Sequence, residues 1–305
     1  MNWPLTQSMQ RTQEQAGDHP IQTIVFSFLM YFMNMIIAAI IGGVFALVAF
    51  GDKLSTIDPE TIEAQLSASP LIVYIGLYFT IIMILIVFLF ARWFQKRKLD
   101  TFGFHKEGIL KQYGKGTLYA IIIMVVIYVI NYMMGTIESQ INPKWDIVSI
   151  ILLLVGFMIQ GMSEEVFLRG YLMNGLASKW GVPIAIIGNS VLFSLLHAGN
   201  PGITVLSYVN LVLAGIFFSL VFYITDNMWL TGALHSFWNF VMGAIFGVQV
   251  SGLDLPGVLM TTTSKESGKL WNGGSFGFEG GLVVTIILFI VCAFLITKRP
   301  KVNQA

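Results

Sequence analysis

The chain has 305 residues, of which 56% are apolar and only 11% are charged. A soluble domain averages about 25% charged residues, so this chain has too few polar side chains to cover a water-exposed surface. The net charge of +1 argues against nucleic acid as a partner, and a single cysteine, Cys292, excludes an intrachain disulfide and a thiolate metal cluster. The composition therefore predicts an integral membrane protein built from helices.

The first 20 residues are polar, and we expect them to form a disordered tail. Apolar runs long enough to cross about 30 Å of hydrocarbon follow along the rest of the chain. The predicted spans are residues 21–50, 71–94, 117–135, 147–162, 183–198, 203–225, 228–250 and 281–297. These runs predict an all-α fold, a polytopic membrane bundle of about eight transmembrane helices.

The lysines and arginines are distributed unevenly between the predicted loops. If both termini lie in the cytoplasm, the outer loops hold four of the 17, namely Lys53, Lys144, Lys265 and Lys269. The inner segments hold the other thirteen, more than half of them in the basic connection at residues 92–115. Because cytoplasmic loops carry an excess of these cations, we expect both termini in the cytoplasm.

Residues 163–170, Ser-Glu-Glu-Val-Phe-Leu-Arg-Gly, place ionisable groups at the end of an apolar run. Each such group at membrane depth costs about 2.5–3.5 kcal/mol on insertion scales, which makes the stretch a candidate functional site. Glu165 and Arg169 stand four residues apart on one helix face and can pair. Glu164 is rotated by about 100° from Glu165, so the same arginine cannot neutralise both carboxylates equally. We therefore predict that Glu165 is structural and that Glu164 is available for chemistry.

Two histidines in apolar surroundings, His197 and His235, are candidate partners for Glu164. If the glutamate helix continues to about residue 177 and turns at 178–183, Glu164 and His197 lie at equal height on antiparallel neighbours. His235 shares a helix face with Asn239, four residues later. It reaches the same site only if the turn near 181 protrudes or the connection at 198–202 dips into the bundle.

A carboxylate, two imidazoles and a carboxamide suit hydrolysis by activated water. Glu164 can act as a general base on a water that His197 helps to hold. His235 and Asn239 can donate hydrogen bonds to the oxyanion that forms at an amide carbonyl. Ser163 and Ser236 are adjacent to this set but point away from it, so we predict no serine nucleophile.

A zinc site made by Glu164, His197 and His235 is the competing chemistry. These residues lack the compact His-Glu-x-x-His spacing of zinc proteases, so we favour the version without metal and expect no cofactor.

Three short motifs occur in order on successive predicted spans: Glu164-Glu165-x-x-x-Arg169, Phe193-x-x-x-His197 and His235-x-x-x-Asn239. Together they resemble the motifs of the CAAX-protease and bacteriocin-processing family of intramembrane proteases, also called the CPBP or Abi family. The resemblance covers roughly residues 146–247. It implies an all-α core, hydrolysis of peptide bonds within the membrane, and the catalytic roles given above for Glu164, His197, His235 and Asn239.

The resemblance further implies that Glu165, Arg169 and Phe193 are structural at the site. On this reading the segments are a disordered tail (1–20), N-terminal spans with a basic cytoplasmic loop (21–145), a catalytic core (146–250), an extracytoplasmic loop (251–280) and a last span with a basic tail (281–305). The family's substrates imply a membrane-associated peptide or a prenylated or lipidated protein as the partner.

Short loops, the lone cysteine and the modest size favour a bacterial plasma membrane. The small-residue pair Gly243-x-x-x-Gly247 favours internal helix packing over dimerisation, so we expect a monomer. A non-catalytic immunity or peptide-binding protein, or a transporter, is the alternative to a protease, since buried charges also mark binding sites and ion pathways.

Overall fold

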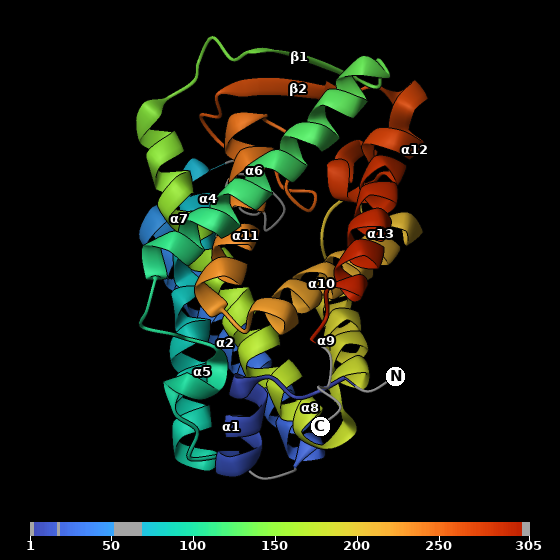
Figure 1. Ribbon diagram of the computed structural model, residues 1–305. Helices are drawn as coiled ribbons and strands as arrows, with labels where there is room; N and C mark the ends of the chain where they lie inside the picture. Colours follow the sequence, from blue (N-terminus) through green and yellow to red (C-terminus); the bar gives the residue numbers. More distant parts are fainter. Residues whose placement is uncertain (1–2, 17–18, 52–68, 301–305) are drawn as a thin grey trace.

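The computed structural model describes residues 3–16, 19–51 and 69–300, and its elements are arranged as a bundle of helices (Figure 1). The α-helices are α1 (Gln7–Ala16), α2 (Pro20–Phe50), α4 (Pro70–Phe79), α5 (Ile81–Phe94), α6 (Ile109–Met133), α7 (Ile147–Glu165), α8 (Asn174–Trp180), α9 (Val182–Leu196), α10 (Val205–Thr225), α11 (Met228–Phe240), α12 (Lys269–Asn272) and α13 (Leu282–Thr297). Two π-helical turns, η3 (Val166–Met173) and η4 (Val241–Ile245), extend α7 and α11.

Within the described residues, five helices are long and apolar enough to cross a membrane. They are Pro20–Phe45, Pro70–Phe94, Ile109–Met133, Ile147–Trp180 and Val205–Thr225, and Val182–Leu196 and Leu282–Thr297 are shorter apolar helices. The protein is therefore a helical membrane bundle. The predicted total of about eight spans and the cytoplasmic placement of both termini stay predictions.

The helix that carries the two glutamates is one continuous rod from Ile147 to Trp180, formed by α7, η3 and α8. Its 34 residues correspond to about 51 Å at 1.5 Å per residue. The rod ends at Gly181, whose φ of +79° is a conformation that favours glycine, and α9 begins at the next residue. The predicted extension beyond Ser163 and the predicted turn at 178–183 are both confirmed. Glu164 lies near the middle of the rod.

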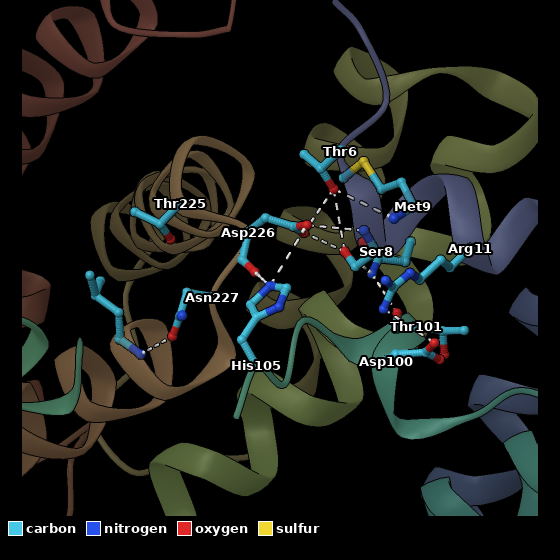
Figure 2. Close-up of polar contacts among 12 residues, drawn as sticks. Thr6, Ser8, Met9, Arg11, Asp100, Thr101, His105, Thr225, Asp226 and Asn227 are labelled. Atoms are coloured by element: carbon cyan, nitrogen blue, oxygen red, sulfur yellow. Dashed lines mark hydrogen bonds and ion pairs between the residues drawn. The ribbon is translucent and has the colours of Figure 1, made fainter. Parts of the chain in front are cut away.

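The predicted disordered tail at residues 1–20 is wrong for residues 7–16, which form α1. Ser8, Met9 and Thr12 on this helix are buried, and α1 packs against α8. The Asp226 carboxylate accepts hydrogen bonds from the Ser8 backbone N–H at 3.0 Å and from Thr6 Oγ1 at 2.8 Å (Figure 2). A carboxylate at a helix N-terminus satisfies free N–H groups and complements the helix dipole, which explains how so polar a segment is held.

The all-α prediction misses a small antiparallel sheet at one end of the bundle (Figure 1). Strand β1 (Ile137–Ile141) pairs with β2 (Met260–Ser264), with Ile137 opposite Ser264 and Ile141 opposite Met260. The segment 251–280, predicted as an extracytoplasmic loop, contains β2 and α12 and buries Phe276 and Phe278. The two strands come from distant parts of the chain, so no local sequence pattern predicts their pairing.

The basic connection at residues 92–115 also does more than carry surface charge. Its Arg97 is buried, and its guanidinium donates to the backbone carbonyls of Gly170 at 2.6 Å and Tyr171 at 3.2 Å. Burial lowers the pKa of Arg97 to about 10, so the group stays charged at neutral pH. A π-helical turn shifts its hydrogen bonds out of the regular α-helical ladder, and here a cation binds carbonyls of that turn.

Candidate active site

Glu165 and Arg169 form a buried ion pair in the middle of the glutamate rod. Arg169 Nη1 lies 2.8 Å from Glu165 Oε1, and both side chains are 0% exposed. Arg169 Nη2 also donates to the carbonyl of Gly215 on α10 at 3.1 Å. The guanidinium carbon lies 5.2 Å from the ring centre of Phe193 and 5.4 Å from that of Phe218. The pair therefore joins three helices, as a structural role requires.

His235 on α11 is held against this ion pair. Its Nδ1 lies 2.7 Å from Glu165 Oε1, and because a carboxylate only accepts, Nδ1 carries the proton. The ring stacks on Phe218 with centroids 4.5 Å apart. These contacts fix the ring plane and direct Nε2 toward Glu164, whose Oε2 is 3.7 Å away.

Glu164 has a different environment from its neighbour. Its side chain is 28% exposed, and one carboxylate oxygen, Oε1, accepts a hydrogen bond from Gln160 Nε2. The other oxygen, Oε2, has no hydrogen-bond partner among the described residues. A carboxylate oxygen with free acceptor capacity beside an imidazole is the arrangement that a general base needs.

Gln160 is a site residue that our sequence reasoning missed. Its Oε1 accepts a hydrogen bond from Asn239 Nδ2 at 2.9 Å while its Nε2 donates to Glu164. One amide thus links the predicted base to the predicted oxyanion donor. The signal was present in the sequence, because Gln160 precedes Glu164 by four residues and so lies on the same helix face.

His197 lies at the end of α9, directly before the connection to α10. Its Nδ1 lies 2.8 Å from the carbonyl of Phe193, one turn earlier, and the two rings are 4.7 Å apart. Because a carbonyl only accepts, Nδ1 carries the proton, and Nε2 is the unprotonated nitrogen of the neutral ring. Phe193 therefore positions His197 in addition to covering Arg169.

The four predicted catalytic side chains line one cavity of about 850 Å³. Glu164, His197, His235 and Asn239 come from α7, the end of α9 and α11, and Asn200 and Pro201 of the α9–α10 connection line the same cavity. The predicted convergence is thus found, including the predicted approach of the connection at 198–202. The catalytic roles of these residues stay predictions.

Neither serine next to the motifs is placed as a nucleophile. Ser163 Oγ donates to the backbone carbonyl of Thr80 at 2.9 Å, and Ser236 Oγ donates to that of Gly232 at 2.7 Å. Both hydroxyl protons are bound by main-chain carbonyls, and no imidazole is positioned to remove them in these contacts. The arrangement suits attack by water.

The donor atoms around Glu164 fit a metal site poorly. Among the residues that the structure describes, no group of three or more His, Cys, Asp or Glu side chains is placed to hold a metal ion. Glu164 and His235 approach each other, but His197 does not join them as a third ligand. A catalytic zinc ion needs three protein ligands, so the donor set around Glu164 does not fit zinc.

The comparison with known families agrees with the motifs that line the cavity. Residues 146–241 match the family model of the Rce1-like type II CAAX prenyl endopeptidases. This range contains all four predicted catalytic residues, and the resemblance stated from the three motifs is confirmed. No curated protein and no solved structure matches the chain. The matched family consists of proteases of the CAAX type, and the apolar helices indicate that this chain is an integral membrane protein.

Proposed function

We propose that this protein is an intramembrane endopeptidase that hydrolyses a peptide bond with a water activated by Glu164. The observation that carries the proposal is the free Oε2 of Glu164, which faces His235 Nε2 at 3.7 Å in a cavity also lined by His197 and Asn239. The adjacent Glu165 pairs with Arg169 in the buried interior, so we assign Glu165 a structural role and Glu164 the catalytic one.

In the first step, a water molecule bound between Glu164 and His197 attacks the carbonyl carbon of the scissile bond. Glu164 Oε2 accepts one proton from that water as the new C–O bond forms. The unprotonated Nε2 of His197 accepts a hydrogen bond from the same water and orients its lone pair. The product of this step is a tetrahedral intermediate with a negatively charged oxygen.

His235 and Asn239 are the donors for this oxyanion. Asn239 Nδ2 uses one N–H for Gln160 and has a second N–H to donate. His235 Nδ1 donates to Glu165, and its Nε2 faces the cavity, where in its protonated form it donates to the oxyanion. Donors fixed before the reaction lower the barrier without reorganisation.

In the last step the intermediate collapses, the C–N bond breaks and the electron pair of that bond goes to nitrogen. Glu164 returns its proton to the leaving amine, which restores the carboxylate. Atoms and charges balance with one water consumed, one carboxylic acid product and one amine product.

The substrate in this proposal is a membrane-associated peptide or a prenylated or lipidated protein, in a bacterial plasma membrane. The family match supports a CAAX-type peptide bond hydrolase. An alternative without turnover, an immunity or peptide-binding protein of the Abi type, would use the same cavity to grip a peptide.

The test is cleavage of a quenched fluorescent peptide with an apolar anchor by the purified protein in detergent. Glu164→Gln keeps the size of the side chain and removes the base, so we expect kcat to fall about 10²–10⁴-fold. Glu138→Gln, an exposed carboxylate paired with Lys265, is the matched control and should retain wild-type activity. A folded Glu164→Gln protein that cleaves at the wild-type rate would overturn the proposal, and peptide binding without any turnover in wild type would favour the alternative.

A further inference from the structure

Strand β2 has one edge paired with β1 and a second edge that is turned away from it. The pairing is flanked by Leu259, whose carbonyl accepts from the Asn142 N–H at 3.0 Å, and by Lys265, whose N–H donates to the Thr136 carbonyl at 2.9 Å. In an antiparallel pair every second residue of a strand turns its backbone groups toward the partner. The odd-numbered residues of β2 therefore face β1, and its even-numbered residues face the other way.

The backbone groups of these even-numbered residues are not bound by the rest of the described chain. The residues are Met260, Thr262 and Ser264, and no other described residue forms a hydrogen bond with their N–H or C=O groups. At Met260 the carbonyl is covered by Gly247, which approaches so closely that a Cβ would not fit between them. The open part of the edge is therefore residues 262–264.

The open edge lies along a second cavity, of about 570 Å³. Thr261, Thr262, Thr263 and Ser264 all line it, whereas no residue of β1, which the structure describes in full, does so. Because successive side chains of a strand point to opposite faces of the sheet, a cavity that contacts four consecutive residues follows the edge of the strand. Its volume is in the range of about 300–1,000 Å³ that ligand pockets have.

This edge is held in place and lacks the features that usually block a free edge. Thr262 Oγ1 donates to the Phe246 carbonyl at 2.5 Å and accepts from Ser139 Oγ of β1 at 2.8 Å. Natural proteins block free edges with lysine, proline or a bulge. Residues 261–264 contain neither lysine nor proline, and their register with β1 is continuous. Such an edge is a template onto which an extended peptide can add as a strand.

The second cavity adjoins the one that contains Glu164. Asp254 and Leu255 line both cavities. Leu253 and Asp254 are exposed at this boundary, so a peptide can pass from one cavity to the other without entering the packed interior. One extended peptide can therefore present a bond to Glu164 and lie along β2 with another segment.

We propose that the substrate binds in extended form, with a segment on one side of the scissile bond added to β2 as a third strand at residues 262–264. The inference rests on the peptidase function proposed above and adds to it how the peptide is held. The added strand exchanges hydrogen bonds with the N–H and C=O groups of Thr262 and Ser264. Since these bonds are made to the main chain, the edge binds the peptide backbone, and side-chain preferences come from the cavities on either side.

The first test uses the wild-type protein and a series of fluorescent peptides, each with one backbone N–H replaced by N-methyl at successive positions outside the scissile bond. In a strand every second N–H faces a given neighbour. We expect KM to rise about ten-fold at alternate positions on one side of the bond, the effect of one to two hydrogen bonds, with little change at the positions between. A series without this alternation would overturn the inference and leave the peptidase standing, whereas no cleavage of the unmethylated peptide would overturn both.

The second test removes one outward N–H from each edge of the sheet. Ser264→Pro removes it from the open edge of β2, and Ile141→Pro removes it from the outer edge of β1 as the matched control. Neither change deletes a hydrogen bond between the strands, and proline is tolerated at such edge positions.

We expect Ser264→Pro to raise KM about ten-fold with little change in kcat, and Ile141→Pro to keep the wild-type KM. Unfolding temperatures in detergent compare the folding of the two variants. An unchanged KM in a stably folded Ser264→Pro protein, or an equal rise in both variants, would contradict strand addition at β2. If Ser264→Pro unfolds at a lower temperature than Ile141→Pro, the N-methyl series on the wild-type protein decides alone.

Discussion

Two neighbouring regions of the site differ in burial. One is the cavity wall, formed by Gln160, Glu164 and Asn239, and the other is the buried ion-pair cluster of Glu165, Arg169 and His235. At the cluster, Glu165 is fully buried and bound by Arg169 and His235. At the wall, Glu164 is partly exposed and keeps one oxygen without a partner. The difference arises because a step of one residue turns a helix by about 100°, from the packed interior to the cavity. A fully buried carboxylate held by a cation and an imidazole gives rigidity, and one that lines a cavity can react.

The largest effect on stability is expected from a substitution in the ion-pair cluster. Arg169→Met leaves the buried charge of Glu165 without its cation, and loss of one partner of a buried pair costs about 3–5 kcal/mol of stability. Thermal unfolding of the purified protein in detergent measures this cost.

The control for that variant is Arg11→Met, which removes a half-exposed ion pair with Asp100. Exposed pairs contribute about 0–1 kcal/mol, so this variant should unfold close to wild type. Equal destabilisation by the two substitutions would contradict a structural role of the buried pair.

The next largest effect is expected on kcat, from a substitution in the cavity wall that leaves the ion-pair cluster intact. Asn239→Ala removes an oxyanion donor, and we expect kcat to fall about 10²–10³-fold with a much smaller change in KM. Steady-state kinetics on the fluorescent peptide separate the two constants. A rise in KM at unchanged kcat would instead make Asn239 a residue that binds the ground state.

The Gln160 side chain binds two residues of the cavity wall, Glu164 and Asn239, so its substitution tests the wall separately from the ion-pair cluster. Gln160→Leu removes both hydrogen bonds at similar volume, and we expect about a ten-fold loss of kcat, of the order of one to two hydrogen bonds. If Gln160 acts by positioning Asn239, its effect should shrink in an Asn239→Ala background, and this double-mutant cycle reports the coupling. Strict additivity of the two losses would contradict a positioning role.

The smallest expected effect lies far from both regions, where Asp226 caps α1 (Figure 2). Asp226→Ala removes this cap, and caps contribute about 0.5–2 kcal/mol. Protease sensitivity of the first 16 residues should rise, while cleavage of the peptide substrate stays close to wild type. An inactive Asp226→Ala protein would show that α1 contributes to the site.

Much of the site could be predicted from the sequence because its geometry is local to helices. The i, i+4 pairs Glu165–Arg169 and Phe193–His197 required only the helical repeat, and both are in contact. The prediction that Glu164 and His197 share one site required one further assumption, the turn near residue 181, and both residues line the same cavity. The same i, i+4 spacing places Gln160 beside Glu164. A glutamine carries no charge, so an apolar run that contains one does not indicate a functional site.

The parts that the sequence did not reveal depend on contacts between distant segments. The pairing of β1 with β2 and the binding of α1 to Asp226 join residues more than 100 positions apart. The burial of Arg97 against the carbonyls of η3 is of the same kind, because a lysine- and arginine-rich connection is ordinarily solvated. In each case a polar segment forms hydrogen bonds with residues distant in the sequence, which composition alone does not predict.

The most direct test of the division of labour compares Glu164→Gln with Glu165→Gln, two isosteric changes at neighbouring positions, by measuring both kcat and unfolding temperature. The account predicts that Glu164→Gln unfolds like wild type and has lost peptide hydrolysis, whereas Glu165→Gln unfolds at a clearly lower temperature. An active Glu164→Gln protein, or a Glu165→Gln protein as stable as wild type, would contradict it.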